Sequence, residues 1–376
     1  MRVLHLIGGG DIGGAKTAVL SLVKELNKYI EVNLVSFRSG IFTDEARSMG
    51  INVVIIDSGN IFNDIKSVTS LVREDQYQII HSHGSKANMI AATAGHTTET
   101  PTVTTVHSDY RLDYLHSIPK RFSYGLINTI ALRFIKYHIG VSNNYKKMLI
   151  DRKFDSENIF TIYNGIDFDE MLGSYNRRDF ASKYGIDLKD DDIVVGILSR
   201  LHPVKGLGTF IKAARLVLNQ NPKVKFIIGG DGDERKSLEK KAEALSLKNS
   251  LYFIGWVNDR YEFMDSIDIN VLTSISETFS YVILEGARLK KATISTDVGG
   301  ISDLVENDKT GYLFNPGDHN KLSEHILKFV NDKGLRDDMG EKVYERARTN
   351  FSLENMCKTQ LDIYRSIIGR SKSEVQ

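Results

Sequence analysis

The sequence predicts an α/β protein with two doubly wound, Rossmann-like domains, each built on a parallel sheet. Short apolar runs alternate with helical patterns along the chain, which is typical of such sheets. The length of 376 residues exceeds one typical core and suits two domains. A polar stretch over residues 167–192 interrupts the alternation, so we place an N-terminal domain at 1–168 and a C-terminal domain at 169–354. We expect ligand to bind in a cleft facing the carboxyl ends of both sheets.

The expected strands are short runs of apolar and β-branched residues, and the segments between them carry helical periodicity, as over 15–26. In the first half we expect strands at Val3–Ile7, Val32–Ser36, Asn52–Ile56, Ile79–Ser82, Thr102–Val106, His138–Val141 and Ile159–Tyr163. In the second half we expect them at Ile193–Leu198, Lys225–Ile228, Leu251–Ile254, Ile269–Leu272 and Thr293–Ser295.

The turn after the first strand, from Gly8 to Gly13, matches the G-x-G-x-x-G string of dinucleotide-binding turns. Glycines there let the backbone approach another group, and a helix N-terminus favours an anion. A nicotinamide site would also need an acidic residue at the end of the second strand, where the sequence reads Ser-Phe-Arg-Ser over 36–39. An NAD(P)-dependent oxidoreductase is therefore the less favoured alternative.

Composition limits the class of protein further. The net charge of +1, with 41% hydrophobic and 26% charged residues, describes an ordinary globular protein and gives no sign of nucleic-acid binding. The single cysteine, Cys357, excludes an internal disulfide and suits a reducing compartment. Since no run reaches about 18 apolar residues, we expect a cytoplasmic enzyme that does not cross a membrane.

Two cations follow the first strand of the second half. Arg200 and Lys205 lie in one predicted loop at a strand's carboxyl end, where they could clamp a diphosphate without a metal. Solvated surface cations are the alternative.

Two glutamates flank a predicted helix start farther along the chain. Glu277 precedes the helix and Glu285 lies more than one turn inside it, while the N–H groups of Phe279, Ser280 and Tyr281 form an anion site. A carboxylate accepts two hydrogen bonds from a vicinal diol, so each acid suits a sugar ring. Capping and surface charge are the alternative.

Two glycine-rich turns complete the set, at residues 229–234 and 295–303. The first contains Asp231-Gly232-Asp233, a D-x-D string of the kind that holds a divalent metal in some sugar transferases. We expect these aspartates to turn the chain and cap the next helix, with metal binding as the weaker alternative.

These blocks, in this order, resemble the family-4 retaining glycosyltransferases of the GT-B fold, whose E-x7-E signature matches Glu277 to Glu285. The resemblance covers essentially the whole chain. It runs through Gly13-Gly14, Thr105-Val106-His107, Tyr163-Asn164-Gly165-Ile166-Asp167, Ser199-Arg200, Lys205-Gly206, Gly230-Asp231-Gly232 and Val298-Gly299-Gly300.

The resemblance implies a nucleotide-sugar donor, expected to be a UDP-sugar, held by the C-terminal domain. Arg200 and Lys205 would bind the diphosphate, Glu285 the ribose hydroxyls and Glu277 the donor sugar. The other donor-binding residues would be Gly13, Gly14, Gly230, Trp256, Val257, Phe279, Ser280 and Tyr281. The final helix, residues 355–370, would cross back to the N-terminal, acceptor-binding domain.

The expected chemistry is hexosyl transfer with retention and without a metal or other cofactor. Bond cleavage makes the sugar positive and the departing diphosphate negative, so fixed cations and a helix N-terminus favour the transition state. We assign catalytic roles to Glu277, His107, Arg200 and Lys205. Retention and the place of His107 near the donor sugar come from the resemblance.

The acceptor side is less defined, and His83 is our candidate contact there. Residues 111–153 carry nine basic and two acidic side chains, and the segment 118–137 mixes basic with aromatic and apolar residues. Such a segment suits an interfacial helix on an anionic membrane surface, and equally a core-facing helix with basic solvent residues. Under the first interpretation the protein is peripheral on the inner membrane face and the acceptor is a saccharide or lipid-linked saccharide of cell-envelope or exopolysaccharide synthesis.

A nucleotide-sugar epimerase or a phosphorylase of similar fold stays open as an alternative function. An epimerase would turn over without an acceptor, and a phosphorylase would depend on inorganic phosphate.

Overall fold

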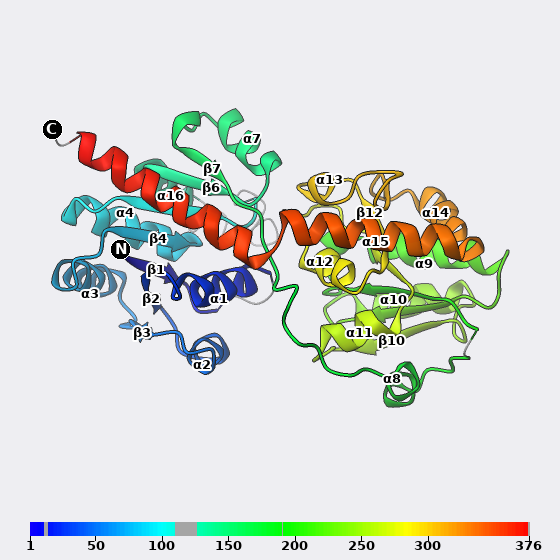
Figure 1. The fold of residues 1–376 in the computed structure, drawn as a ribbon. Coiled ribbons are helices and arrows are strands. Elements are labelled where there is room, and N and C mark those ends of the chain that lie inside the picture. The colour runs from blue at the N-terminus through cyan, green and yellow to red at the C-terminus, as the bar shows by residue number, and fades with distance from the viewer. Residues whose placement is uncertain (11–13, 110–125, 190, 375–376) are drawn as a thin grey trace. The chain divides into compact units, whose positions relative to one another are not determined.

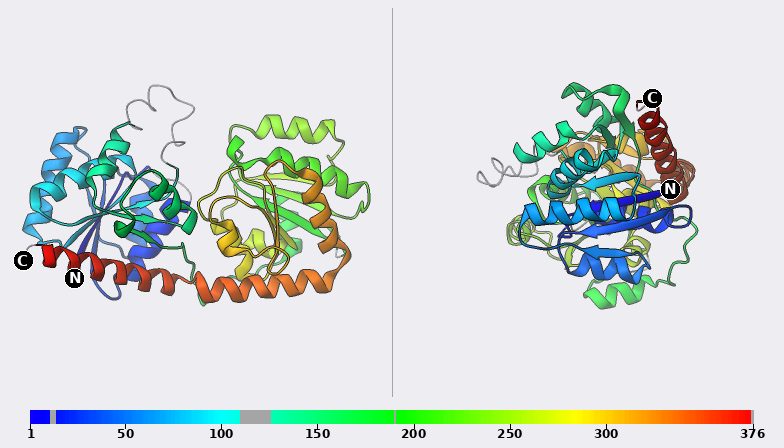
Figure 2. Two further views of the ribbon diagram at one scale, coloured as in Figure 1. Left: turned by 90° about the horizontal axis from the view of Figure 1, so that it is seen from above. Right: turned by 90° about the vertical axis from the view of Figure 1, so that its left-hand side faces the viewer.

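The computed structural model describes residues 1–10, 14–109, 126–189 and 191–374, which form two compact units (Figure 1). Unit 1 comprises Met1–Gly165 and Leu353–Gln376, and unit 2 comprises Ile166–Ser352. Each unit holds a parallel sheet with helices on both faces (Figure 2). The prediction of two doubly wound α/β domains is therefore confirmed.

The sheet of unit 1 has the strand order β3-β2-β1-β4-β5-β6-β7. Its strands are β1 (Arg2–Ile7), β2 (Glu31–Ser36), β3 (Val53–Ile55), β4 (Ile79–His83), β5 (Thr102–Val106), β6 (Tyr137–Gly140) and β7 (Ile159–Thr161). The helices are α1 (Gly14–Leu26), α2 (Ile41–Ser48), α3 (Ile61–Glu74), α4 (Ser85–Thr98), α6 (Leu126–Phe134), α7 (Asn143–Asp151), the short η2 (Ser156–Asn158) and α16 (Leu353–Glu374).

The sheet of unit 2 has the strand order β10-β9-β8-β11-β12-β13. Its strands are β8 (Val194–Leu198), β9 (Lys225–Gly229), β10 (Leu251–Gly255), β11 (Ile269–Leu272), β12 (Ala292–Thr296) and β13 (Tyr312–Phe314). The helices are α8 (Arg177–Tyr184), η3 (Pro203–Lys205), α9 (Leu207–Leu218), α10 (Arg235–Ala244), α11 (Arg260–Ser266), α12 (Tyr281–Arg288), α13 (Ile301–Leu304), α14 (His319–Asn331) and α15 (Lys333–Asn350).

Alternate residues of the central strands fill two separate cores in unit 2. Val195 and Ile197 of β8 are buried with Phe210 of α9 in one core. Val194, one position away, is buried with Phe180 of α8 and the α11 side chains in the other. Strand side chains point alternately to the two faces of a sheet, so this apolar run is covered on both sides.

One face of the unit 1 sheet is apolar and the other is polar at its centre. Leu4 and Leu6 of β1 pack into a core with side chains of α3 and α4. His5, between them, is fully buried on the opposite face, where its ring contacts Tyr364 of α16. The last helix thus covers the face of the sheet that carries a buried histidine.

The sequence missed one strand, β13, which pairs with β12 through Tyr312, Leu313 and Phe314. It has three residues, as do β3 and β7, which the sequence did predict, so its length alone does not explain why it was missed. All the strands that the sequence predicted are present, with shifts of a residue or two at their ends.

Candidate functional site

The predicted donor-binding residues follow strands that lie side by side in unit 2. The strands β9, β8, β11 and β12 are consecutive in the sheet and parallel, so the loops after them meet at one edge. Backbone hydrogen bonds join these loops directly. They run from Leu201 N to Asp231 O at 2.9 Å, from Ile275 N to Val204 O at 2.8 Å and from Gly300 N to Thr278 O at 2.9 Å.

Two of the predicted glycines make this close approach possible. A Cβ atom on Gly230 would lie 1.9 Å from the carbonyl oxygen of Ser199, and one on Gly299 would lie 1.7 Å from that of Glu277. Gly299 also has φ of +59°, a left-handed conformation that glycine adopts without strain. The glycine-rich turns therefore hold neighbouring loops together.

Lys205 and Glu277, predicted separately, form an ion pair. The Nζ atom of Lys205 lies 2.5 Å from Oε1 of Glu277, and the hydroxyl of Ser274 donates to the same oxygen at 2.6 Å. The two charged side chains are only 19% and 12% exposed. The loops after β8 and β11 thus bring a cation and an anion to one partly buried point.

Arg200, the other predicted phosphate ligand, lies exposed in the same β8 loop. Its carbonyl oxygen accepts a hydrogen bond from His202 N, while its guanidinium makes no ion pair with any residue that the structure describes. Arg200 is therefore a positive charge without an ion-pair partner among the described residues.

The helix behind Glu277 begins slightly later than the sequence predicted. α12 starts at Tyr281, and Ser280 is its N-cap without a side-chain capping bond. The four N–H groups at this helix start are thus those of residues 280–283, so Ser280 and Tyr281 of the three predicted donors belong to it. Phe279 is buried against Phe351, with ring centroids 5.2 Å apart, and so has a packing role.

Glu285 is buried in α12 and paired with an arginine that the sequence analysis missed. Its side chain is 3% exposed, and Nη1 of Arg260 lies 2.6 Å from its Oε1 atom. Burial raises the pKa of Glu285, and the Arg260 charge opposes that rise. The only sequence signal for Arg260 was its position at the start of a helix after the β10 loop.

The two residues predicted beside the nucleotide base differ in exposure. Trp256 is 63% exposed, whereas Val257 packs against the unit 2 core near Gly229. Trp256 is therefore available for stacking, and Val257 supports its loop. In the D-x-D turn, Asp231 accepts a hydrogen bond from the N–H of Gly232, which is the turn-forming role expected of it.

Two of the predicted site residues in unit 1, His83 and His107, are hydrogen-bonded to each other. His83 is only 3% exposed, and its two ring nitrogens are bonded to His5 at 3.1 Å and His107 at 3.0 Å. This leaves neither nitrogen for the acceptor contact that we predicted. Burial lowers the pKa of His107 to about 4, so its ring is neutral at pH 7.

The first turn of the chain is described only in part. Gly14 begins α1, and Gly13 lies outside the described residues. Gly9, at φ of +79°, packs against the loop after β2, because a Cβ atom there would lie 2.2 Å from the Ser36 hydroxyl. Gly9, which occupies the x position between Gly8 and Gly10 of the G-x-G-x-x-G string, therefore serves packing between strand ends.

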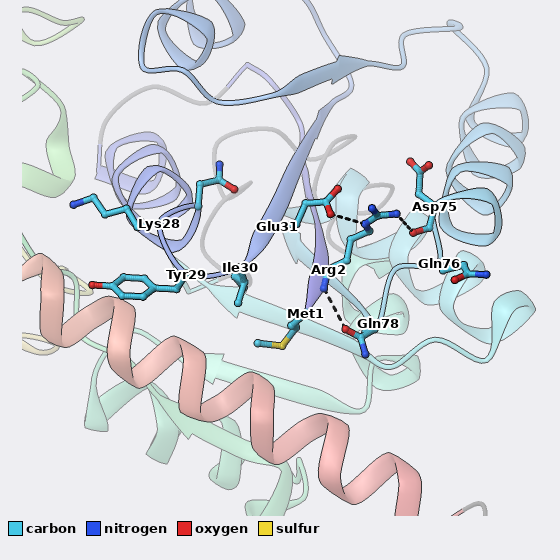
Figure 3. A pocket seen from close by; sticks show the side chains of 10 residues that line it. Met1, Arg2, Lys28, Tyr29, Ile30, Glu31, Asp75, Gln76 and Gln78 are labelled. Carbon is cyan, nitrogen blue, oxygen red and sulfur yellow. Dashed lines mark hydrogen bonds and ion pairs between the residues drawn. The ribbon is translucent and has the colours of Figure 1, made fainter.

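Two surface cavities lie away from these residues. One of about 770 Å³ lies at the amino ends of the unit 1 strands, lined by polar groups such as Arg2, Glu31 and Gln78 (Figure 3). Another of about 520 Å³ lies between α15 and residues 306–310. Neither contains a predicted site residue. Among the described residues, no helix is both long and apolar enough to span a membrane.

Comparison with known proteins identifies both halves of the chain. Residues 12–170 match the profile of Glycosyltransferase Family 4, and residues 180–346 match that of the Glycosyl transferases group 1. The capsular polysaccharide biosynthesis glycosyltransferase CapM of Staphylococcus aureus is 25% identical over 323 residues, with 84% of each chain covered. An Escherichia coli UDP-Gal:alpha-D-GlcNAc-diphosphoundecaprenol alpha-1,3-galactosyltransferase is 26% identical over 321 residues, with 82% of each covered.

The fold agrees with a solved GT-B structure. HepE from Anabaena, crystallised with UDP, superposes with a TM-score of 0.84 at 24% identity, covering 97% of this chain and 100% of that one. The chain is therefore a glycosyltransferase of the GT-B fold, with a Family 4 domain followed by a group 1 domain.

Proposed function

We propose that the protein transfers a hexosyl group from a UDP-sugar to a saccharide or lipid-linked acceptor in cell-envelope polysaccharide synthesis, with retention and without a metal. The names of CapM and the E. coli galactosyltransferase support the pathway and a UDP-sugar donor. HepE has been crystallised with UDP, with UDP and glucose, and with UDP-glucose, which supports the same donor class.

The observation that carries this proposal is the ion pair of Lys205 and Glu277 beside the start of α12. Glu277 neutralises the positive charge of Lys205 until a ligand anion displaces the glutamate. A diphosphate would compete with Glu277 for Lys205, and it would also pair with Arg200. The N–H groups of the first turn of α12 favour a negative charge at the same place. Glu277 would then be free to accept hydrogen bonds from sugar hydroxyls.

The Glu285–Arg260 pair suits the ribose of the nucleotide. Because Arg260 binds one carboxylate oxygen, it orients the group, and its positive charge opposes the rise in the pKa of Glu285 that burial causes. An oriented carboxylate accepts hydrogen bonds from two vicinal hydroxyls. Exposed Trp256 would stack on the base.

The chemistry follows from where charge develops. As the anomeric bond breaks, negative charge grows on the diphosphate, and Arg200, Lys205 and the α12 N-terminus are already positioned to stabilise it. His107 is neutral, so its ring would contact the donor sugar without repelling the positive charge that forms there. We assign no protein nucleophile, and the leaving phosphate would take the acceptor proton on the same face.

A membrane contact through residues 118–137 is part of the proposal. Residues 118–125 lie outside the described part of the chain, but α6 presents Ile130 and Phe134 to solvent at 50% and 75% exposure. They are four residues apart and therefore adjacent on the helix surface. An exposed apolar pair in a basic segment suits an anionic lipid surface, which a lipid-linked acceptor would require.

The test is a transfer assay with a UDP-sugar panel, with and without EDTA. Wild-type turnover in EDTA should be unchanged. Lys205→Ala should lose about 10²–10³ in kcat, the usual loss for one charge-stabilising donor. Lys223→Ala is the matched control, since its pair with Asp191 is exposed on the surface of the same unit.

Three results would contradict the proposal. Complete loss of activity in EDTA would sink the metal-free mechanism. Equal rates for Lys205→Ala and Lys223→Ala would sink the site assignment. Turnover that needs inorganic phosphate, or that proceeds without acceptor to an epimerised donor, would point to the alternative classes.

A further inference from the structure

Four histidines and a tyrosine form a hydrogen-bonded cluster in unit 1, in which His107 is partly buried and the other four residues are buried. His5 of β1 pairs in register with His81 of β4, and His83 lies two residues further along β4, so all three rings share one face of the sheet. Tyr364 of α16 covers them and is fully buried. Thr105 of β5 and His107, just beyond it, extend the cluster at either end.

The contacts run in a single unbranched sequence. Nε2 of His107 lies 3.0 Å from Nδ1 of His83, and Nε2 of His83 lies 3.1 Å from Nδ1 of His5. The Tyr364 hydroxyl then bridges Nε2 of His5 at 2.8 Å and Nδ1 of His81 at 2.7 Å. Nε2 of His81 ends the sequence on the Thr105 hydroxyl at 2.7 Å. We call these six residues the histidine chain.

Each ring in the histidine chain is neutral at pH 7. Burial lowers the pKa of His5 to about 3 and that of His107 to about 4, and it lowers the pKa of His81 and His83 as well. A neutral imidazole carries one N–H and one acceptor nitrogen. Each ring must therefore donate in one of its two contacts and accept in the other.

One proton for each contact allows only two complete arrangements. If His107 donates, then every ring donates from Nε2, Tyr364 donates to His81, and Thr105 accepts. If Thr105 donates, then every ring carries its proton on Nδ1, Tyr364 donates to His5, and Nε2 of His107 accepts from His83. A mixed set would turn the Tyr364 proton away from both rings, leaving a fully buried hydroxyl unpaired, which is costly. The Thr105 hydroxyl, whose own proton points out of the chain in the first arrangement, belongs to a residue that is 5% exposed.

We propose that the histidine chain is one tautomer-coupled unit, in which His107, His83, His5 and His81 always carry their protons on the same type of ring nitrogen. The hydroxyl of Tyr364, contributed by the C-terminal helix, is the link that transmits this state between β1 and β4.

A metal ion is the competing interpretation of the same rings. Nitrogens of His5, His81 and His83 lie within 4.8 Å of one another, close enough for three ligands. However, both nitrogens of each ring already have a hydrogen-bonding partner at 2.7–3.1 Å. A metal would have to break these contacts, whereas the proton arrangement satisfies all of them.

The consequence for catalysis rests on the role of His107 in the proposed function. The histidine chain uses Nε2 of His107, so a ligand would meet Nδ1. Nδ1 is an acceptor in the first arrangement and an N–H donor in the second. Tyr364 and His83 are therefore positioning residues that decide which of the two His107 offers to a sugar hydroxyl.

The direct test is two-bond ¹H–¹⁵N NMR of the full-length protein with ¹⁵N-labelled histidine. The chain has ten histidines, and the six outside the histidine chain can be assigned by substitution. We expect the same fraction of Nε2–H at all four rings, including under fast exchange between the arrangements. A differing fraction at any of them, or metal-type shifts at His5, His81 and His83, would overturn the proposal.

The matched variants are Tyr364→Phe and Tyr77→Phe. Tyr77 is a buried tyrosine of the same unit whose hydroxyl contacts Asn33 instead of histidine. Tyr364→Phe removes the link between His5 and His81, so the Nε2–H fraction of His81 should differ from that of the other three rings. The kcat should fall at least fivefold, with the donor KM within twofold of wild type. Tyr77→Phe should leave both unchanged. Four equal fractions in Tyr364→Phe would refute the coupling.

The two proposals fail in distinguishable ways. If His107→Ala retains full transfer activity, the catalytic role of His107 is wrong, while the shared tautomer still stands on the NMR result. If His107→Ala is inactive but Tyr364→Phe keeps the wild-type kcat, then the positioning role of Tyr364 is wrong.

Discussion

Arg260→Ala should destabilise unit 2 in a pH-dependent way. The substitution leaves Glu285 buried, with its side chain 3% exposed and without its partner at 2.6 Å. Two unit charges at that separation attract by about 6 kcal/mol at an effective dielectric constant of 20 and by about 1.6 kcal/mol in bulk water. Because the Arg260 side chain is 46% exposed, solvent screens the pair, and we expect a loss near the lower figure, about 2 kcal/mol.

The pH dependence follows from the carboxyl group that stays behind. Burial holds the pKa of Glu285 above its ordinary value of 4.5, and losing Arg260 raises it further. The folded variant then binds this proton more tightly than the unfolded chain. The destabilisation caused by the buried, ionised carboxylate therefore has its full value above the folded-state pKa of Glu285. It disappears as the pH falls toward 4.5.

The measurement is urea unfolding of wild type and Arg260→Ala at pH 7.5 and pH 5. The difference in the free energy of unfolding should be larger at pH 7.5, and adding Glu285→Gln should remove most of it. Arg235→Ala is the control, since its partner Glu239 is 44% exposed and little loss is expected. An equal loss at both pH values, or no rescue by Glu285→Gln, would refute the reasoning.

Three further predictions concern two glycines, Trp256 and the exposed apolar pair of α6. Gly299→Ala should cost about 2–4 kcal/mol through its clash and positive φ, whereas Gly317→Ala, with open space at φ of +86°, should cost about 1 kcal/mol by urea unfolding. Trp256→Ala should leave stability unchanged and weaken UDP binding by about tenfold, as measured by calorimetry. Ile130→Ser with Phe134→Ser should abolish flotation with anionic liposomes while transfer to a soluble acceptor persists; undiminished flotation would exclude this surface.

The fold could be predicted because its signals are local. Apolar runs and helical spacing mark each strand and helix independently, and β13 is the one strand of the described residues that was not predicted. The charged residues in the loops after β8 and β11 could also be placed from the sequence, because they directly follow strand ends. Their roles in binding and catalysis stay predictions.

The remaining parts of the site depend on contacts between distant positions. Arg260 reaches Glu285 across 25 residues, and His5 reaches Tyr364 across 359. Neither residue stands in a motif of its own, so no spacing rule could join them. His83 illustrates the reverse error, because its place at a strand end suggested an accessible ligand, whereas it is 3% exposed and bonded to His5 and His107.

The division of unit 1 into Met1–Gly165 and Leu353–Gln376 has a consequence for biosynthesis. A ribosome releases all of unit 2 before it completes α16, whose Tyr364 and Ile367 are fully buried. The first half of the chain therefore stays incomplete, with the polar face of its sheet uncovered by α16, while the second half can already fold. The domain that begins first finishes last, and a truncation at the C-terminus would damage the N-terminal fold.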